Sequence, residues 1–274
     1  MTGLRENVHR NFGGQAKQGD VAPYVLVTGS KNRVEDLIKY WKNPKKIANH
    51  YAFLLFTGSY KGIPLSACST GIGGTSVSIA IEELCRLGAG TFLRIGVTSP
   101  LKDELSLGEI VIAQGAVRWD GASLDYVRPE FPALAHFEVV MAAISAAESL
   151  KTPYKVGIIG DMASLGPMRE DGYRKYLYHR TYNMRQALYD VGVIDGTGES
   201  AVLFVQASLY GLRAGTIHIN GEDKEKGQWD SRVEDTITKV GLETIKILAE
   251  WDKRKRDNLQ KYIIPFYPSN IFND

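Results

Sequence analysis

The sequence has little of what several protein classes require. It has two cysteines in 274 residues, Cys68 and Cys85, which argues against a disulfide framework. No spacing of cysteine and histidine fits a metal site, and no apolar run approaches the ~20 residues that span a bilayer. Residues 1–18 are polar and lack the apolar core of a secretory signal. We therefore expect a cytoplasmic protein with reduced cysteines, no bound metal and no membrane partner.

The sequence also lacks an excess of either charge. It contains 33 Lys and Arg against 31 Asp and Glu, a formal net charge of +2. A surface that binds a nucleic-acid backbone needs clustered basic residues. The one basic cluster, residues 253–256, falls in an expected C-terminal helix, where a solvated helix face is the simpler interpretation. We expect no nucleic-acid partner.

Strand-like and helix-like apolar patterns alternate along the whole chain. Strands are expected at 24–28, 52–57, 63–69, 91–95, 109–113, 154–159 and 214–219. Helices are expected at 33–42, 75–87, 133–149, 174–189, 200–210 and 236–255. This alternation predicts an α/β fold with a parallel or mixed sheet covered by helices on both faces. No linker or repeat divides the sequence, so we expect one domain over residues 1–274.

Ligands of such sheets gather at the carboxyl ends of the strands. Gly29 follows the first expected strand, and Arg33 begins the next helix. A glycine lets a ligand approach the backbone closely, and an arginine at a helix start can bind an anion. The alternative is an ordinary strand-to-helix turn with a solvated Arg33.

Two further charged residues interrupt apolar patterns. Arg94 lies within an expected strand, where a charged side chain is rarely buried without a partner. It either pairs with a buried carboxylate or binds an anionic ligand. Glu199 opens an expected helix, where it either complements the helix dipole or accepts hydrogen bonds from a sugar diol. The glycine-rich loop 69–76 has the spacing of neither a P-loop nor a dinucleotide fingerprint.

Several motifs together carry a family resemblance. They are STGIGGTSVSIAIEELCRL at 69–87, FLRIG at 92–96, WDGASL at 119–124, PEFP at 129–132, ESA at 199–201 and GLRAG at 211–215. On these motifs the chain closely resembles the uridine phosphorylases of the nucleoside phosphorylase superfamily, from about residue 9 to the last helix. The resemblance implies a single-domain three-layer sandwich, with a mixed, distorted barrel-like central sheet flanked by helices.

The resemblance also implies an activity and partners. Members of that family cleave the N-glycosidic bond of a nucleoside with inorganic phosphate, which gives ribose 1-phosphate and a free base. Phosphate is thus the co-substrate, and no cofactor is implied beyond a structural monovalent cation. Members are homodimers or hexamers built as trimers of dimers, in which each site borrows residues from a neighbour. A paralogous subunit is an alternative partner.

The resemblance assigns residues to three subsites, with Arg33 and Arg94 as the catalytic pair. The phosphate subsite comprises Gly29, Arg33, Tyr51, Arg94 and Val97. The ribose subsite comprises Thr197, Gly198, Glu199 and His9, the last lent by the adjacent subunit. The base subsite comprises Thr98, Ser99, Leu165, Arg169 and Asp171.

Several of these positions depart from the family pattern. Val97 replaces a threonine that touches phosphate and ribose, and Tyr51 replaces an arginine lent across the dimer. Residues 197–198 replace a Glu-Met pair, and residues 169 and 171 replace the Gln and Arg that read uracil. Each lost hydrogen bond to a charged group typically costs ~1.5–3 kcal/mol. Three functions stay open: an active phosphorylase for uridine or a related nucleoside, a catalytically impaired paralogue or nucleoside-binding subunit, and a hydrolytic nucleosidase.

Overall fold

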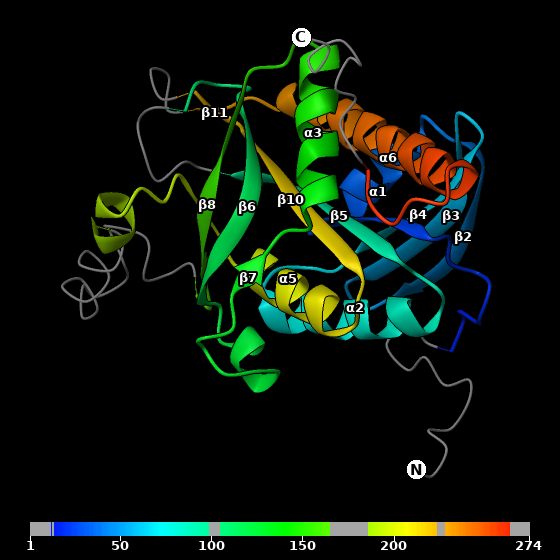
Figure 1. Cartoon of the computed structure of the whole chain (residues 1–274), viewed down its shortest axis with the longest axis horizontal. Helices are drawn as coiled ribbons and strands as arrows, with labels where there is room; N and C mark the ends of the chain where they lie inside the picture. Colours follow the sequence, from blue (N-terminus) through cyan, green and yellow to red (C-terminus); the bar gives the residue numbers. More distant parts are fainter. Residues whose placement is uncertain (1–11, 13, 99–104, 165–185, 224–227, 264–274) are drawn as a thin grey trace, which may run out of the picture.

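The structure is a computed structural model that describes residues 12, 14–98, 105–164, 186–223 and 228–263 (Figure 1). The strands are β1 (Tyr24–Thr28), β2 (Lys42–His50), β3 (Phe53–Tyr60), β4 (Ile63–Ser69), β5 (Thr91–Thr98), β6 (Ile110–Trp119), β7 (Ala133–Leu134), β8 (Tyr154–Met162), β9 (Asp195–Thr197), β10 (Arg213–Asn220), β11 (Glu222–Asp223) and β12 (Gln228–Trp229). The helices are α1 (Lys31–Ile38), α2 (Gly74–Arg86), the 3-10 helix η2 (Ala122–Asp125), α3 (Phe137–Ser149), α5 (Ser200–Leu209) and α6 (Val233–Asp257).

The central sheet is mixed, as the sequence predicts. Its strand order is β2-β3-β4-β1-β5-β10-β6-β8-β9, with β7 paired to β6. The middle strands β4, β1, β5 and β10 are parallel, so their carboxyl ends meet at one edge. The neighbouring β6 is antiparallel to β10, and β8 and β9 run parallel to β6. Strands β11 and β12 form a separate two-stranded sheet.

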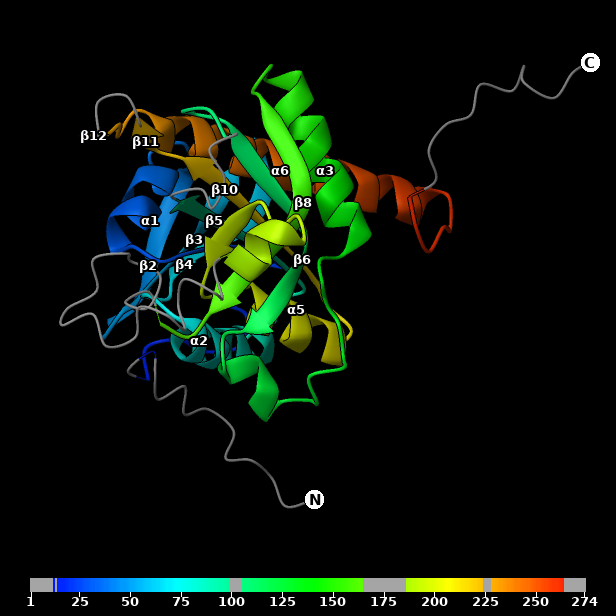
Figure 2. The same ribbon diagram turned by 90° about the vertical axis from the view of Figure 1, so that its left-hand side faces the viewer.

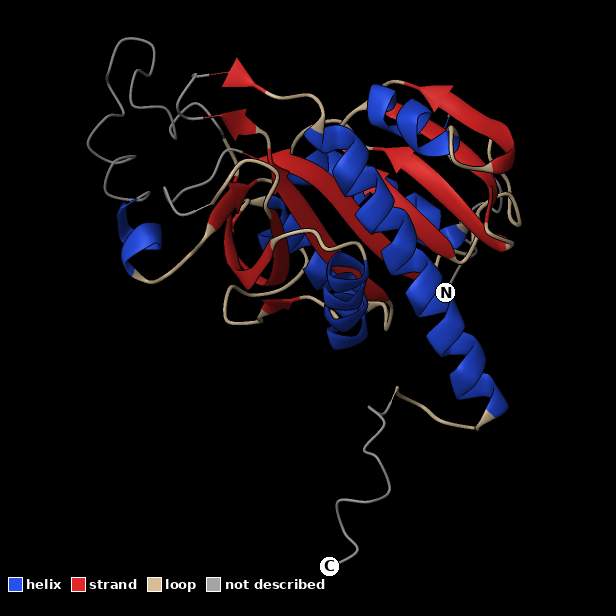
Figure 3. Cartoon of the chain, turned by 90° about the horizontal axis from the view of Figure 1, so that it is seen from above, coloured by secondary structure: helices blue, strands red, loops and turns tan. Residues whose placement is uncertain are grey.

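Helices cover both faces of the sheet. Figures 1 and 2 show α3 and α6 on one side of the strands and α2 with α5 on the other. Viewed from above, the long α6 lies across the strands (Figure 3). Alternation along β5 divides its side chains between the layers, because Phe92 packs with α2 and α5 while Leu93 and Ile95 pack with α3 and α6. Arg94 therefore points toward the α2 and α5 layer.

The sheet curls, although it does not close into a barrel. Strands β2 and β9 are the two ends of the strand order, and no described ladder joins them. Curling nevertheless brings β9 against β5, where Thr98 Oγ1 donates a hydrogen bond to Asp195 Oδ1 at 2.5 Å. The expected barrel-like distortion is thus present as curvature, and it gathers residues of β5, β9 and β10 at one place.

Two expected helices differ from the structure by four residues at one end. The helix predicted at 33–42 spans Lys31–Ile38, and Lys42–His50 forms the edge strand β2, whose mostly exposed polar side chains gave no strand pattern. The helix predicted at 133–149 begins at Phe137, because residues 133–134 pair with β6 and the His136 side chain accepts a hydrogen bond from Glu138 N. Of the helix predicted at 174–189, residues 174–185 lie outside the described residues.

The expected state of the cysteines is confirmed. Cys68 is buried in β4, Cys85 is half-buried in α2, and both are free. Burial raises the pKa of both thiols, which keeps them protonated and unreactive. Among the described helices, none combines the length and apolarity that a membrane span requires.

Candidate functional site

The centre of the site is a buried contact between Arg94 and Glu199. Arg94 lies in β5 and points toward α5, and Glu199 is the residue that precedes α5. Arg94 Nη2 donates to Glu199 Oε2 at 2.6 Å, and each residue is 6% exposed. Of the two interpretations of Arg94, pairing with a buried carboxylate is confirmed, and the carboxylate is the proposed ribose ligand.

The Glu199 carboxylate is held by donors from two loops. Gly73 N donates to Oε1 at 2.9 Å, while Thr197 Oγ1 and Gly198 N donate to Oε2 at 2.7 and 3.1 Å. Burial alone would raise the pKa of Glu199, but Arg94 and these donors lower it to about 2. The side chain makes no capping bond to its own helix. The main described partner of Glu199 is thus Arg94, and Glu199 lies at the start of a helix whose dipole also favours its negative charge.

Two backbone features bring these donors to Glu199. Gly73 has a φ of +95°, a conformation that favours glycine, and it precedes α2, so the glycine-rich loop presents its N–H to a carboxylate. The cap of α5 is instead Asp161 of β8, whose Oδ2 accepts a hydrogen bond from Ala201 N. Glu199 is thereby free to face Arg94.

Arg33 is buried, so the solvated-arginine interpretation is wrong. Its Nη1 donates to Thr28 Oγ1 at 3.4 Å, and its Nη2 donates to Glu234 Oε2 of α6 at 3.3 Å. Burial lowers the pKa of Arg33, Glu234 raises it, and the positive charge of Arg94 lowers it again. Thr28 directly follows Val27, which pairs with Arg94 across β1 and β5. The contact with Thr28 therefore places Arg33 beside the strand pair of Arg94.

Each of these arginines keeps unused N–H donors, one of which is completely buried. The Nε atoms of Arg33 and Arg94 are buried and have no hydrogen-bond partner among the described residues. A buried N–H without an acceptor is costly, and two neighbouring guanidiniums repel each other. An oxyanion that accepts from the unused N–H groups of the two guanidiniums would offset their repulsion, which is the chemistry of a phosphate site.

A comparison of the sequence with known families gives a match over most of the chain. The family model of the phosphorylase superfamily matches residues 23–250. The chain belongs to the phosphorylase superfamily. Among curated members of that superfamily, it is similar to a uridine phosphorylase of Thermococcus kodakarensis, with 41% identity over 241 residues, 87% of each chain. The expected resemblance is thus confirmed.

Two further superfamily relatives cover most of the chain. A uridine phosphorylase of Escherichia coli is 34% identical over 235 residues, 85% of this chain and 92% of the relative. A guanosine phosphorylase of Halorubrum lacusprofundi is 32% identical over 202 residues, 73% of this chain and 78% of the relative. The relatives' names thus include both a pyrimidine and a purine nucleoside.

The structure describes some of the other expected site residues and not the rest. Gly29 is half-buried between β1 and α1, and Val97 is half-buried and packs on the apolar core. Tyr51 is 77% exposed at the turn between β2 and β3, with a φ of +49° and its ring 4.2 Å from that of His50. Thr98 contacts Asp195. Outside the described residues lie His9, Ser99, Leu165, Arg169 and Asp171, whose roles stay predictions.

Sequence reasoning missed two residues of the site, His218 and Asp195. His218 lies in β10 beside Arg94, with 3.0 Å between Arg94 Nη1 and His218 Nε2. Its Nδ1 lies 2.6 Å from Asp195 Oδ2. Both residues are almost completely buried. The signal that could have found His218 is its place in the apolar run Ile217-His218-Ile219, where a polar side chain needs a partner.

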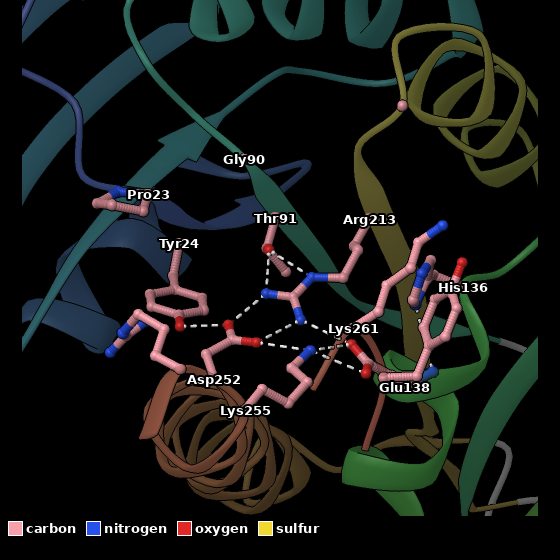
Figure 4. A pocket seen from close by; sticks show the side chains of 13 residues that line it. Pro23, Tyr24, Gly90, Thr91, His136, Glu138, Arg213, Asp252, Lys255 and Lys261 are labelled. Atoms are coloured by element: carbon pink, nitrogen blue, oxygen red, sulfur yellow. Dashed lines mark hydrogen bonds and ion pairs between the residues drawn. The ribbon is translucent and has the colours of Figure 1, made fainter. Parts of the chain in front are cut away.

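A separate pocket of about 500 Å³ lies at the opposite, amino-terminal ends of β1, β5 and β10 (Figure 4). Arg213 in its wall donates to Glu138 and Asp252, and Lys255 contacts the same two carboxylates. These charges neutralise one another and tie α3 and α6 to the sheet. The pocket contains none of the expected site residues, and the described contacts give it a structural role.

Proposed function

We propose that the protein is a nucleoside phosphorylase, which cleaves the N-glycosidic bond of uridine or a related nucleoside with inorganic phosphate. The observation that carries this proposal is the contact of Arg94 with Glu199 beside a second buried arginine, Arg33. It places an anion-binding group directly against a group suited to a sugar hydroxyl. Membership of the phosphorylase superfamily supports the same reaction.

The reaction exchanges one bond at the anomeric carbon for another. The C1′–N bond breaks, its electron pair leaves with the base, and a phosphate oxygen forms a bond to C1′. The ribose carries oxocarbenium character in the transition state, as in glycoside hydrolysis. A phosphate held by Arg33 and Arg94 places negative charge beside that developing positive charge. The base takes up a proton after or during its departure.

Glu199 has room for one sugar hydroxyl. The described donors are distributed unevenly over its two carboxylate oxygens. Oε2 already accepts from Arg94, Thr197 and Gly198, whereas the one described donor to Oε1 is Gly73 N. We therefore assign Oε1 as the acceptor for the 2′-hydroxyl of ribose. Because its pKa is about 2, Glu199 is ionised at neutral pH and also favours a cationic sugar.

Two positions that depart from the family pattern, Val97 and Tyr51, are compatible with the proposed reaction. Val97 packs on the core and its side chain offers no hydrogen bond, so among the described side chains Arg33 and Arg94 are the charged groups proposed to hold the anion. Tyr51 stands exposed at a hairpin tip, which suits the expected contribution to a neighbouring subunit, and we propose a homo-oligomer on that ground. Neither feature by itself supplies a water-activating base, so nothing specific favours the hydrolytic or the non-catalytic alternative.

Base release from a nucleoside panel, with and without phosphate, tests the proposal. The panel contains uridine, thymidine, guanosine, inosine and adenosine. We expect release of at least one base that requires phosphate. Release without phosphate would indicate a nucleosidase, and no release from any member would indicate a binding protein, and either result overturns the proposal.

Two variants test whether that activity depends on the site. Arg94→Ala is expected to abolish phosphate-dependent base release, because it removes a guanidinium and leaves Glu199 buried without its counter-charge. The matched control is Arg86→Ala, which removes an arginine of α2 that is half exposed and paired with Glu82 on the same helix. An unaffected rate in Arg94→Ala would remove Arg94 from the site.

A further inference from the structure

We propose that Asp195 and His218 form a positioning pair that fixes the guanidinium of Arg94 for phosphate. The inference rests on the proposed function and deepens it. Its basis is a continuous buried chain of hydrogen bonds that runs from Asp195 through His218 and Arg94 to Glu199. These four residues come from β9, β10, β5 and the start of α5, so tertiary structure alone brings them together.

The roles of the two imidazole nitrogens follow from the chemistry of arginine. A guanidinium can only donate hydrogen bonds, so His218 Nε2 must accept the bond from Arg94 Nη1 at 3.0 Å. Nε2 therefore carries no proton in this arrangement. The proton then resides on Nδ1, which donates to Asp195 Oδ2 at 2.6 Å. Both nitrogens of His218 are therefore engaged within the protein.

Asp195 is itself fixed by its neighbours. Its Oδ1 accepts from Thr98 Oγ1 at 2.5 Å and from Gly196 N at 2.7 Å, while Oδ2 accepts from His218. The side chain is completely buried. A buried carboxylate with both oxygens occupied holds the histidine in one tautomer and one orientation. Asp195 thus acts on Arg94 through His218.

Arg94 is consequently held from two sides. Nη1 is bonded to His218 and Nη2 to Glu199, which fixes the plane of the guanidinium and leaves Nε without a described partner. The second N–H groups of Nη1 and Nη2, together with the Nε–H, are the donors that remain for the proposed phosphate. Rigid placement of a charged donor before the substrate arrives strengthens electrostatic stabilisation. His218 and Asp195 are therefore positioning residues, since neither touches the reacting atoms in this arrangement.

Two substitutions of His218 separate positioning from simple packing. His218→Leu introduces an apolar side chain of similar size and so removes the acceptor for Arg94. His218→Gln can place an amide oxygen near the Nε2 position and so restore an acceptor. We expect the KM for phosphate to rise at least tenfold in the Leu variant, with the KM for the nucleoside changed less than twofold, and Gln to recover most of the loss.

The outcomes decide the proposal. An unchanged phosphate KM in a folded His218→Leu variant, or equal behaviour of Leu and Gln, would overturn it. If neither variant folds, Asp195→Asn is measured instead, and a phosphate KM equal to that of the wild type would overturn it. Calorimetry with inorganic phosphate alone repeats the comparison without turnover. A wild-type protein that binds phosphate but releases no base would contradict the proposed function. The positioning inference would then be tested by comparing the phosphate affinities of the wild type and the His218 variants.

Discussion

Gly96 of β5 lies directly beside His218 of β10, and the space where a Gly96 side chain would stand is occupied. A Cβ atom on Gly96 would lie 2.5 Å from Arg94 Nη1 and 2.9 Å from His218 Cδ2. The absence of a side chain at this position therefore allows the arginine and the histidine to meet. Glycine is needed at this position of the FLRIG motif because it has no side chain. Its φ is not positive, so backbone conformation does not require glycine here.

Replacement of Gly96 by alanine is expected to displace the Arg94 guanidinium. Both contact distances are shorter than normal packing allows, and the arginine is held on its other side by Glu199. We expect kcat/KM for phosphate to fall at least tenfold, with little change in the circular dichroism spectrum. Gly90→Ala is the matched control, because its Cβ would make an ordinary 3.7 Å contact with Pro23 O. Equal activity of the two variants would contradict the steric argument.

Glu199→Gln is expected to change both activity and acid stability. In the native protein the pKa of Glu199 falls from 4.5 to about 2, so its stabilising charge is fully present above pH 4.5 and is lost as pH falls toward 2. At 1.36 kcal/mol per pKa unit, the loss amounts to about 3 kcal/mol. Urea unfolding at several pH values measures it. A stability difference between wild type and variant that does not shrink toward pH 2 would refute this assignment.

Asp161→Asn is expected to stabilise the protein at high pH. Burial, and then the charges of Glu199 and Asp120, raise the pKa of Asp161 well above the ordinary value, against the hydrogen bond from Ala201. The native state thus favours the protonated form, and this contribution is lost as pH rises through the native pKa. Asparagine is neutral throughout and keeps an oxygen for Ala201 N.

Unfolding free energies at pH 5 and pH 8 check the Asp161 prediction. The stability of the variant relative to the wild type should be greater at pH 8 than at pH 5, because the unfolded carboxyl ionises first as pH rises. Asp125→Asn, at an exposed position, is the control and should show no pH-dependent difference. A variant that is clearly less stable than the wild type at pH 8 would mean that the ionised carboxylate is needed to cap α5.

Arg213→Ala is expected to reduce stability while the kinetic constants of the folded protein stay unchanged. Arg213 begins β10, at the end of the sheet opposite to Arg94, and pairs with Glu138 and Asp252 (Figure 4). Glu138 is 1% exposed, so its charge would lose one of its two cationic partners. Removing one member of a buried pair costs about 3–5 kcal/mol. Thermal unfolding and assays well below the midpoint test the prediction together, and a changed phosphate KM would contradict it.

Much of the architecture could be predicted because its patterns are local. The apolar runs of β1, β4, β5 and β10 and the period of α2, α5 and α6 follow from burial on one or both faces. Strand β2 could not be found in this way, because its side chains are mostly exposed and its place depends on backbone pairing with β3. The start of α3 was missed for a similar reason, since pairing of residues 133–134 with β6 outweighs helix propensity there.

The site could be predicted only where a residue stood out from its surroundings. Arg94 and Glu199 interrupt apolar patterns, and the structure joins them. Other partners in the site depend on contacts between distant segments, such as Arg94 with His218, 124 positions away, and His218 with Asp195 of β9. No local pattern specifies such a pair. Arg33 was singled out from the sequence, but its partner Glu234, 201 positions away, was not.

The most direct measurement of the central claim is the fate of phosphate during turnover. Phosphorus-31 NMR follows inorganic phosphate and sugar phosphate in one sample that also yields free base. If Arg33 and Arg94 hold a phosphate against the ribose on Glu199, a pentose 1-phosphate signal should grow in step with the free base. Free base that accumulates while the inorganic phosphate signal stays constant would contradict the account.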